Sequence, residues 1–214
     1  MKKTATLEQL REYRELTQNM NIDSDFEKIN KFVEEYDTMC QVYEENGKEG
    51  VKDILGEVLV PAVFDCVAMT FEDVYRGLVI PVVNDGKFAL VRPDGAGTLA
   101  SEFIFDDIHF YEWFYYTVKD GKYGLYTNGG HEVLPPVADK VFEPFNDLVA
   151  YQVGDKFGFT MLGLGSYTEA IFEDYNPDDD GRLSVLLDGK KGYLDEDAQF
   201  TEDRDEAYFH AECI

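Results

Sequence analysis

Lysine residues recur at nearly constant intervals through most of this chain. They stand at Lys48, Lys87, Lys122, Lys156 and Lys190, which are 39, 35, 34 and 34 residues apart. Self-similarity at a period of about 35 residues is typical of repeat architectures, in which small units bury a core only by stacking on their neighbours. This spacing limits the possible folds more strongly than any other feature of the sequence.

Four of the lysines follow a two-residue turn that comes after an apolar, β-rich stretch. The turns are Asp85-Gly86, Asp120-Gly121, Gly154-Asp155 and Asp188-Gly189. Asp-Gly between β-rich stretches predicts a hairpin, because a type I′ turn needs positive φ at both of its central residues. The stretches before the turns are Leu78–Val83, Phe114–Val118, Leu148–Val153 and Leu183–Leu187. We therefore expect at least four hairpins, each at the same place in its unit.

Two further positions recur in each unit. A small residue stands two places after the lysine, in the strings Phe88-Ala89-Leu90, Tyr123-Gly124-Leu125, Phe157-Gly158-Phe159 and Lys191-Gly192-Tyr193, with Glu49-Gly50-Val51 as a degraded first copy. Glycine weakens a strand, so we expect an aromatic ring or a neighbouring backbone to pack over it. Acidic residues follow an apolar stretch at Asp65, Asp106, Asp139 and Glu173-Asp174. We interpret them as acceptors for turn N–H groups, with a repeated ligand set as the alternative.

The first 46 residues follow a helical pattern instead. Apolar residues recur every three or four positions in two segments that are separated by residues 21–24, as expected for amphipathic helices. Thr6 with Gln9, and Ser24 with Glu27, have capping-box spacing, and Asn46-Gly47 is typical of a helix end. We predict a helical cap over residues 1–46 that packs on one end of the β-repeat domain of residues 47–214.

The repeat resembles the WG (KWG) repeat family over about residues 47–209. That family's unit combines Gly-Lys-Trp-Gly, an apolar-Pro-Pro segment and a following acidic residue. The best match here is Gly121-Lys122-Tyr123-Gly124-Leu125-Tyr126, followed by Val133-Leu134-Pro135-Pro136 and Asp139. The signature Trp is replaced by Phe88, Tyr123, Phe157 or Lys191. The resemblance implies tandem β-hairpins and no catalytic chemistry. We expect a mainly β fold with an N-terminal helical segment, as an open capped array or a propeller-like one.

Charge and composition narrow the function. The net charge is −25, from 44 acidic and 19 basic residues, which disfavours nucleic acid and anionic membranes as partners. The charge either maintains solubility or favours a protein with a basic surface. Apolar stretches such as Val58–Phe64 are far shorter than the ~20 residues of a membrane span. Three scattered cysteines and no apolar stretch after Met1-Lys2-Lys3 favour the cytoplasm.

No catalytic pattern is visible, and we expect no cofactor. The three histidines lack metal-ligand spacing, and no phosphate-binding loop or nucleophile elbow occurs. The string that starts at Asn176, with Asp178 and Asp180, matches the start of a calcium-binding loop, but Leu187 stands where the glutamate ligand is needed. A solvated acidic loop is the simpler interpretation.

An aromatic run at residues 110–116 is the best candidate binding surface. Strand alternation places Trp113, Tyr115 and Thr117 on one face and Phe114, Tyr116 and Val118 on the other. If the run is exposed, Tyr111, Trp113 and Tyr115 are the predicted ligand-binding residues, because aromatic faces supply large contact areas. If it is buried, it is simply the strand before the Asp120-Gly121 hairpin, with one face in the core. The first functional hypothesis is a non-enzymatic scaffold for protein–protein interaction. The alternative is a glycan-directed hydrolase or carbohydrate-binding module that uses this run and a carboxylate pair.

Overall fold

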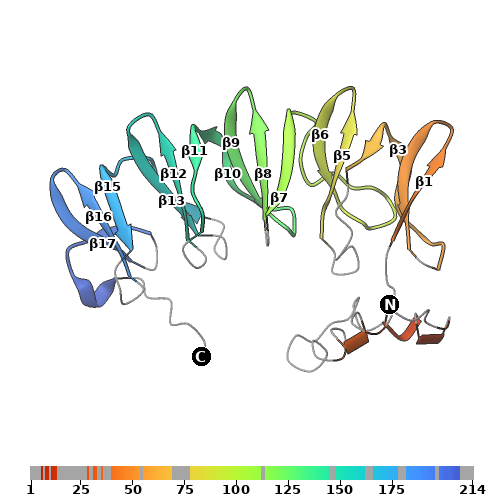
Figure 1. The fold of residues 1–214 in the computed structure, drawn as a ribbon, viewed down its shortest axis with the longest axis horizontal. Coiled ribbons are helices and arrows are strands. Elements are labelled where there is room, and N and C mark those ends of the chain that lie inside the picture. The colour runs from red at the N-terminus through yellow and green to blue at the C-terminus, as the bar shows by residue number, and fades with distance from the viewer. Residues whose placement is uncertain are drawn as a thin grey trace. The chain divides into compact units, whose positions relative to one another are not determined.

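A computed structural model describes most of the chain and assigns it to two compact units. The described residues are 6, 8–9, 11–13, 28, 31–32, 35, 40–53, 55–68, 78–111, 114–144, 148–161, 166–177, 182–195 and 198–207. One unit comprises Met1–Phe105 with Asn128–Gly130, and the other comprises Asp106–Thr127 with His131–Ile214. Figure 1 labels most of the strands, numbered in chain order.

Short antiparallel strands make up nearly all of the described structure. In the first unit they are β1 (Gln41–Glu45), β2 (Lys48–Lys52), β3 (Val58–Phe64), β4 (Cys66–Val67), β5 (Ile80–Asn84) and β6 (Lys87–Val91). In the second unit they are β7 (Asp107–Tyr111), β8 (Phe114–Lys119), β9 (Lys122–Thr127), β10 (Glu132–Ala138), β11 (Lys140–Val141), β12 (Leu148–Val153), β13 (Lys156–Met161), β14 (Ser166–Tyr167), β15 (Asp174–Pro177), β16 (Leu183–Leu187), β17 (Lys190–Leu194) and β18 (Phe200–Thr201), followed by the 3-10 turn η2 (Arg204–Glu206).

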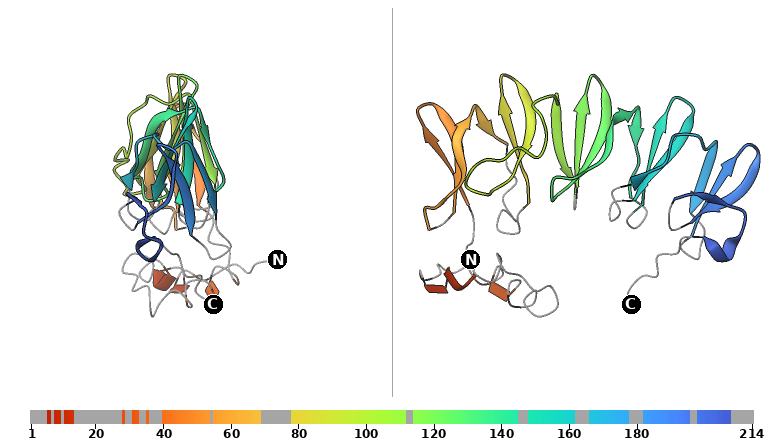
Figure 2. Two further views of the ribbon diagram at one scale, coloured as in Figure 1. Left: turned by 90° about the vertical axis from the view of Figure 1, so that its left-hand side faces the viewer. Right: turned by 180° about the vertical axis from the view of Figure 1, so that it is seen from behind.

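The strands form small sheets, each built around one lysine-tipped hairpin. The first unit holds the sheets β1-β2-β3 and β4-β5-β6. The second holds β10-β9-β8-β7, β11-β12-β13-β14 and β15-β16-β17-β18. The strands of each sheet lie side by side in the right-hand view of Figure 2. The prediction of a mainly β fold made of tandem antiparallel hairpins, with helical residues near the N-terminus, is confirmed.

Positive φ angles at the hairpin tips explain the turn sequences. Asp85, Asp120 and Asp188 have φ near 50°, and the glycine after each has φ near 74°. These are the left-handed angles that a type I′ turn requires. In the reversed turn only Gly154 is left-handed, at φ 63°, as expected where glycine takes the first central position of a type II′ turn.

The helical prediction is wrong for residues 41–46. Residues Gln41–Glu45 form β1 and pair with β2, so that Tyr43 lies opposite Gly50. Asn46 has φ 54° and Gly47 φ 75°, which makes Asn46-Gly47 another hairpin turn. Asn-Gly fits both a helix end and a hairpin, and pairing with β2 decides in favour of the hairpin.

Helical residues occur near the N-terminus, at 8–9, 11–13, 28, 31–32 and 35. The predicted capping box forms at Thr6. The Thr6 N–H donates to Gln9 Oε1 over 2.9 Å, and the Gln9 N–H donates to Thr6 Oγ1 over 3.3 Å. The ring of Tyr13 stacks on that of Phe32 with centroids 4.6 Å apart. The Ser24–Glu27 box lies outside the described residues, and the capping role of the helices stays a prediction.

The glycines two places after the lysines leave room for a neighbour, as predicted. A Cβ on Gly50 would lie 2.5 Å from the carbonyl oxygen of Val60, and one on Gly124 would lie 2.8 Å from that of Leu134. On Gly158 it would lie 2.4 Å from the Tyr151 ring. The neighbouring backbone or ring therefore excludes any side chain at these positions.

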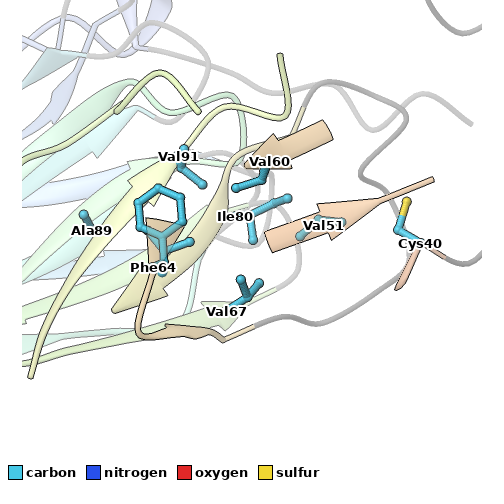
Figure 3. Close-up of a cluster of buried hydrophobic side chains, with 9 residues drawn as sticks. Cys40, Val51, Val60, Phe64, Val67, Ile80, Ala89 and Val91 are labelled. Carbon is cyan, nitrogen blue, oxygen red and sulfur yellow. The ribbon is translucent and has the colours of Figure 1, made fainter. Parts of the chain in front are cut away.

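Adjacent sheets within each unit share an apolar core. Figure 3 shows the cluster of the first unit, where Val51 and Val60 of one sheet pack with Val67 and Ile80 of the next. In the second unit, Phe114 and Leu125 pack with Val149 and Tyr151. A third cluster joins Phe159 and Phe172 with strands β16 and β17. Full burial of such side chains contributes about 1.5–3 kcal/mol each, so these clusters dominate the stability of each unit.

Candidate functional site

Three of the recurring acidic residues each bridge the tips of two successive hairpins. In the first unit, the Lys48 ammonium lies 2.5 Å from Asp65 Oδ1, and the Asp85 N–H donates to Asp65 Oδ2 over 2.7 Å. Asp65 therefore joins the tip of one hairpin to the tip of the next. Hydrogen bonds from Lys48 and from the Asp85 N–H lower the pKa of the Asp65 carboxyl.

The same arrangement, a carboxylate that binds a lysine and a turn N–H, recurs in the second unit. Lys122 Nζ lies 2.5 Å from Asp139 Oδ1, and the Gly154 N–H donates to Asp139 Oδ2 over 2.9 Å. Lys156 Nζ lies 3.5 Å from Glu173 Oε1, while the Gly189 N–H donates to Glu173 Oε2 over 3.0 Å. These contacts support the turn-acceptor interpretation of the recurring acids. Carboxylates that already bind a lysine and a turn amide make a poor repeated ligand set.

The aromatic run folds into a hairpin that the sequence did not predict. Its residues belong to two paired strands, with Tyr111 of β7 opposite Phe114 of β8 and Phe110 opposite Tyr115. Directly opposite residues share a face of the sheet, and successive residues alternate. Tyr111 and Tyr115 therefore lie on opposite faces, and the structure does not bring these two predicted binding residues together. Trp113 lies outside the described residues.

Burial separates the members of the run. Phe110 is 43% exposed and Tyr111 is 37% exposed, whereas Phe114 and Tyr115 are buried. The Phe110 ring lies 5.2 Å from that of Tyr115, and the Tyr111 ring lies 5.5 Å from that of Phe114. Each exposed ring is thus supported by a buried one. Burial raises the pKa of Tyr115 to about 12, which keeps its hydroxyl neutral.

Strand β7 is also the outer strand of its sheet. It pairs with β8, and no other described strand pairs with its free side. Asp107 stands at its start, with Oδ2 3.1 Å from His109 Nε2, and both side chains are exposed. Ile108 is buried, whereas His109 is exposed like the two aromatic residues after it. The strand presents backbone groups, two aromatic rings and a carboxylate at one edge.

Most other described sheet edges carry features that discourage strand pairing. The outer strand β1 is an exception with five residues and no proline, but it ends in two glutamates and carries no pair of exposed aromatic rings. The outer side of β6 forms isolated bridges with Leu99 and Phe105. Pro61 lies in β3, Pro135 and Pro136 lie in β10, and Pro177 ends β15. Proline lacks an N–H and therefore cannot continue a ladder. Strands β4, β11, β14 and β18 have two residues each, which is too short to template a partner. Strand β7 has five residues and no proline. Phe110 was not singled out from the sequence, because the aromatic run was interpreted as one strand and not as two paired strands.

A shallow pocket of about 250 Å³ lies on the last sheet. It is lined by Asp174, Tyr175, Asn176, Ser184, Val185, Leu186 and Lys191. The Ser184 hydroxyl donates to the Asn176 carbonyl over 3.0 Å, so its proton is not directed at a ligand. Lys191 stands on this face where the three preceding repeats have Phe88, Tyr123 and Phe157. The opposite face, with Val185, packs into the core. A polar outer face is what a terminal repeat requires.

The predicted calcium ligands are not brought together in the described part of the chain. Asn176 lies in strand β15, and its side-chain amide donates to the Pro177 carbonyl over 3.2 Å. Asp178 and Asp180 lie outside the described residues. Among the residues that the structure describes, no group of three or more His, Cys, Asp or Glu is placed to hold a metal ion. No helix among them is long and apolar enough to cross a membrane.

Comparison with known proteins yields structural similarity only. No protein-family model and no curated protein matches the chain. A solved structure titled as the eukaryotic initiation factor is 14% identical with a TM-score of 0.35, covering 74% of this chain and 47% of that one. Kluyveromyces lactis Hsv2 is 11% identical with a TM-score of 0.31, covering 77% of this chain and 59% of that one. The chain thus spans about half the length of the structures it matches.

Proposed function

We propose that this chain is a non-enzymatic binding or scaffold module for other proteins, built from divergent WG-like repeats. One observation carries the proposal. The regularly repeated charged groups bind hairpin tips, as Asp65 and Asp139 do, whereas Phe110 and Tyr111 remain exposed on a sheet edge. Rigid aromatic rings supply contact area at low entropic cost and are enriched where proteins bind one another.

The charge of the chain supports a protein partner with a basic surface. A net charge of −25 attracts cationic surfaces over several ångströms and repels phosphate backbones. The same field favours association with a basic protein at low ionic strength. We propose the cytoplasm as the compartment. The thiol of Cys40, which is buried, and that of Cys66, whose pKa is raised by desolvation, suit a reducing environment.

Selection of peptides on the intact chain tests this function. A phage-displayed library of random twelve-residue peptides is enriched on the immobilised protein, and synthetic copies of the enriched peptides are titrated by fluorescence anisotropy. We expect saturable binding of basic peptides that weakens as salt rises. A selection that enriches no saturably binding peptide would contradict the proposal.

The hydrolase alternative is tested in parallel with fluorogenic glycosides. We expect no turnover above the buffer rate. Turnover that scales with protein concentration, and that persists through a second purification step, would favour the enzyme instead.

A further inference from the structure

The free side of β7 offers main-chain hydrogen-bonding groups to another strand. In an antiparallel pair, alternate residues of an edge strand point their N–H and C=O groups away from the neighbouring strand. Strand β7 comprises Asp107–Tyr111 and pairs with β8 through all five residues. Its outward groups are therefore held in extended geometry by the four-stranded sheet β10-β9-β8-β7. Such an edge is the template that an extended peptide needs.

Side chains on both faces of this edge would flank an added strand. Phe110, 43% exposed, lies on the Tyr115 face, and Tyr111, 37% exposed, lies on the Phe114 face. Each ring rests against its buried partner, at 5.2 Å and 5.5 Å respectively. An extended peptide alternates its side chains between the two faces, so one residue would meet Phe110 and a neighbouring residue would meet Tyr111.

The edge strand carries an exposed carboxylate, and the chain as a whole is strongly acidic. The Asp107 carboxylate is exposed at the start of β7. Glu143 is exposed, and it lies close enough to Tyr116 to contribute to the raised pKa of that hydroxyl, on the face that also holds Tyr111. The whole chain carries a charge of −25, so a second copy is repelled and a cationic segment is attracted.

We propose that β7 is a docking edge for an extended, positively charged segment of another protein, which adds a fifth strand to this sheet. The inference rests on the proposed binding function and names the surface and the class of partner. Main-chain hydrogen bonds to β7 hold the segment in register, and its apolar side chains on the two faces cover Phe110 and Tyr111. Lysine or arginine residues pair with carboxylates such as that of Asp107.

A synthetic peptide tests the proposal on the full chain. The probe is a fluorescein-labelled nine-residue peptide in which pairs of valines alternate with pairs of lysines, so that each face of the extended strand carries both residue types. Its Kd is measured by anisotropy. A second peptide of the same sequence carries N-methyl groups on all internal amides, so that neither of its edges keeps its donors. We expect the N-methylated peptide to bind at least tenfold more weakly than the parent. Equal binding of the two peptides, or no binding of the parent, would overturn the proposal.

Protein variants locate the site. Phe110→Ala and Tyr111→Ser are each expected to weaken peptide binding at least fivefold, while Tyr167→Ala, which removes a ring that is 49% exposed on β14, leaves it unchanged. Circular dichroism checks that each variant stays folded. Equal weakening by Tyr167→Ala would refute the assignment to β7. Analytical ultracentrifugation of the wild type tests whether β7 pairs with a second copy of the chain instead. A dimer that Phe110→Lys abolishes would mean that a second copy occupies β7.

The two proposals fail separately. If peptides selected from the random library bind saturably but are insensitive to Phe110→Ala and Tyr111→Ser, the binding function stands and the β7 assignment falls. If no peptide binds at all, both fall.

Discussion

Replacement of Gly50 by alanine tests whether close backbone packing, rather than turn geometry, explains the recurring small residue. The added Cβ would lie 2.5 Å from the carbonyl oxygen of Val60 and 2.7 Å from the amide nitrogen of Ala62. Carbon–oxygen contacts normally begin at about 3.3 Å. Strand β3 must therefore move away from β2 by about 0.8 Å or tilt, and both atoms belong to backbone that cannot rotate aside.

Two opposing effects determine how much Gly50→Ala changes the free energy of unfolding. Overpacking of a core typically costs about 1–3 kcal/mol, and a displaced strand lies at the upper end of that range. Alanine recovers about 0.5–1 kcal/mol relative to glycine, because it loses less conformational entropy on folding. We therefore expect Gly50→Ala to reduce the free energy of unfolding by about 2 kcal/mol. For a chain of this size, that lowers Tm by roughly 4–8 °C.

Thermal unfolding followed by circular dichroism at 218 nm measures this change, and Gly86→Ala is the control. Gly86 is left-handed, at φ 74°, but a Cβ there meets nothing within 4 Å. Its replacement costs only the strain of the angle, about 1–2 kcal/mol, and leaves β2–β3 pairing intact. Hydrogen exchange separates the two variants: Gly50→Ala is expected to lose protection in β2 and β3, and Gly86→Ala only near its turn. Unchanged Tm and unchanged exchange in Gly50→Ala would refute the reasoning.

Three further predictions follow from buried and charged groups. Thr117 is fully buried, and its hydroxyl has no hydrogen-bond partner among the described residues, so Thr117→Val is expected to raise stability by about 1 kcal/mol in urea unfolding. Thr160→Val is the matched control, since the Thr160 hydroxyl donates to a buried carbonyl, and it is expected to lower stability by about 1 kcal/mol; the reverse order would contradict this account. The pKa of Asp139 is lowered by the Gly154 N–H and by Lys122, so the Asp139 carboxylate stabilises the fold above its unfolded pKa near 3.8, and this stabilisation is lost as the pH falls further. Asp139→Asn is therefore expected to reduce the dependence of Tm on pH between pH 5 and pH 3. An unchanged dependence would count against a stabilising contact of Asp139 with Lys122 and Gly154. Burial raises the pKa of Tyr115 and Tyr151 to about 12, so the contribution of these two hydroxyls to stability is constant below pH 10 and declines between pH 10 and pH 12. Tyrosinate absorbance at 295 nm that rises fully by pH 10.5 in the folded protein would disagree.

The candidate site was only partly predictable. The sequence identified the aromatic run, because six aromatic residues within seven positions are conspicuous in any chain. It did not place Tyr111 and Tyr115 on opposite faces, because that depends on a chain reversal between Tyr111 and Phe114 which no Asp-Gly or Asn-Gly pair marks. The exposed ring of Phe110 was missed for the same reason.

What the sequence determined by itself is local and periodic. A two-residue hairpin depends on the φ angles of its own turn, so Asp-Gly at Asp85, Asp120 and Asp188 was sufficient to predict three hairpins. Asn46-Gly47 was ambiguous, because a left-handed asparagine and glycine also end helices, and only pairing of β1 with β2 resolved it.

Only the tertiary structure decided what the repeated residues contact and which surface remains free. Asp139 binds groups 15 and 17 residues away, at Gly154 and Lys122, and Gly50 faces the backbone of β3. Such partners depend on how the strands pair in space, which a periodic pattern does not encode residue by residue. The same pairing leaves β7 without a described strand on its outer side. The surface proposed for binding therefore depends on which strands pair, and the sequence of β7 alone does not determine it.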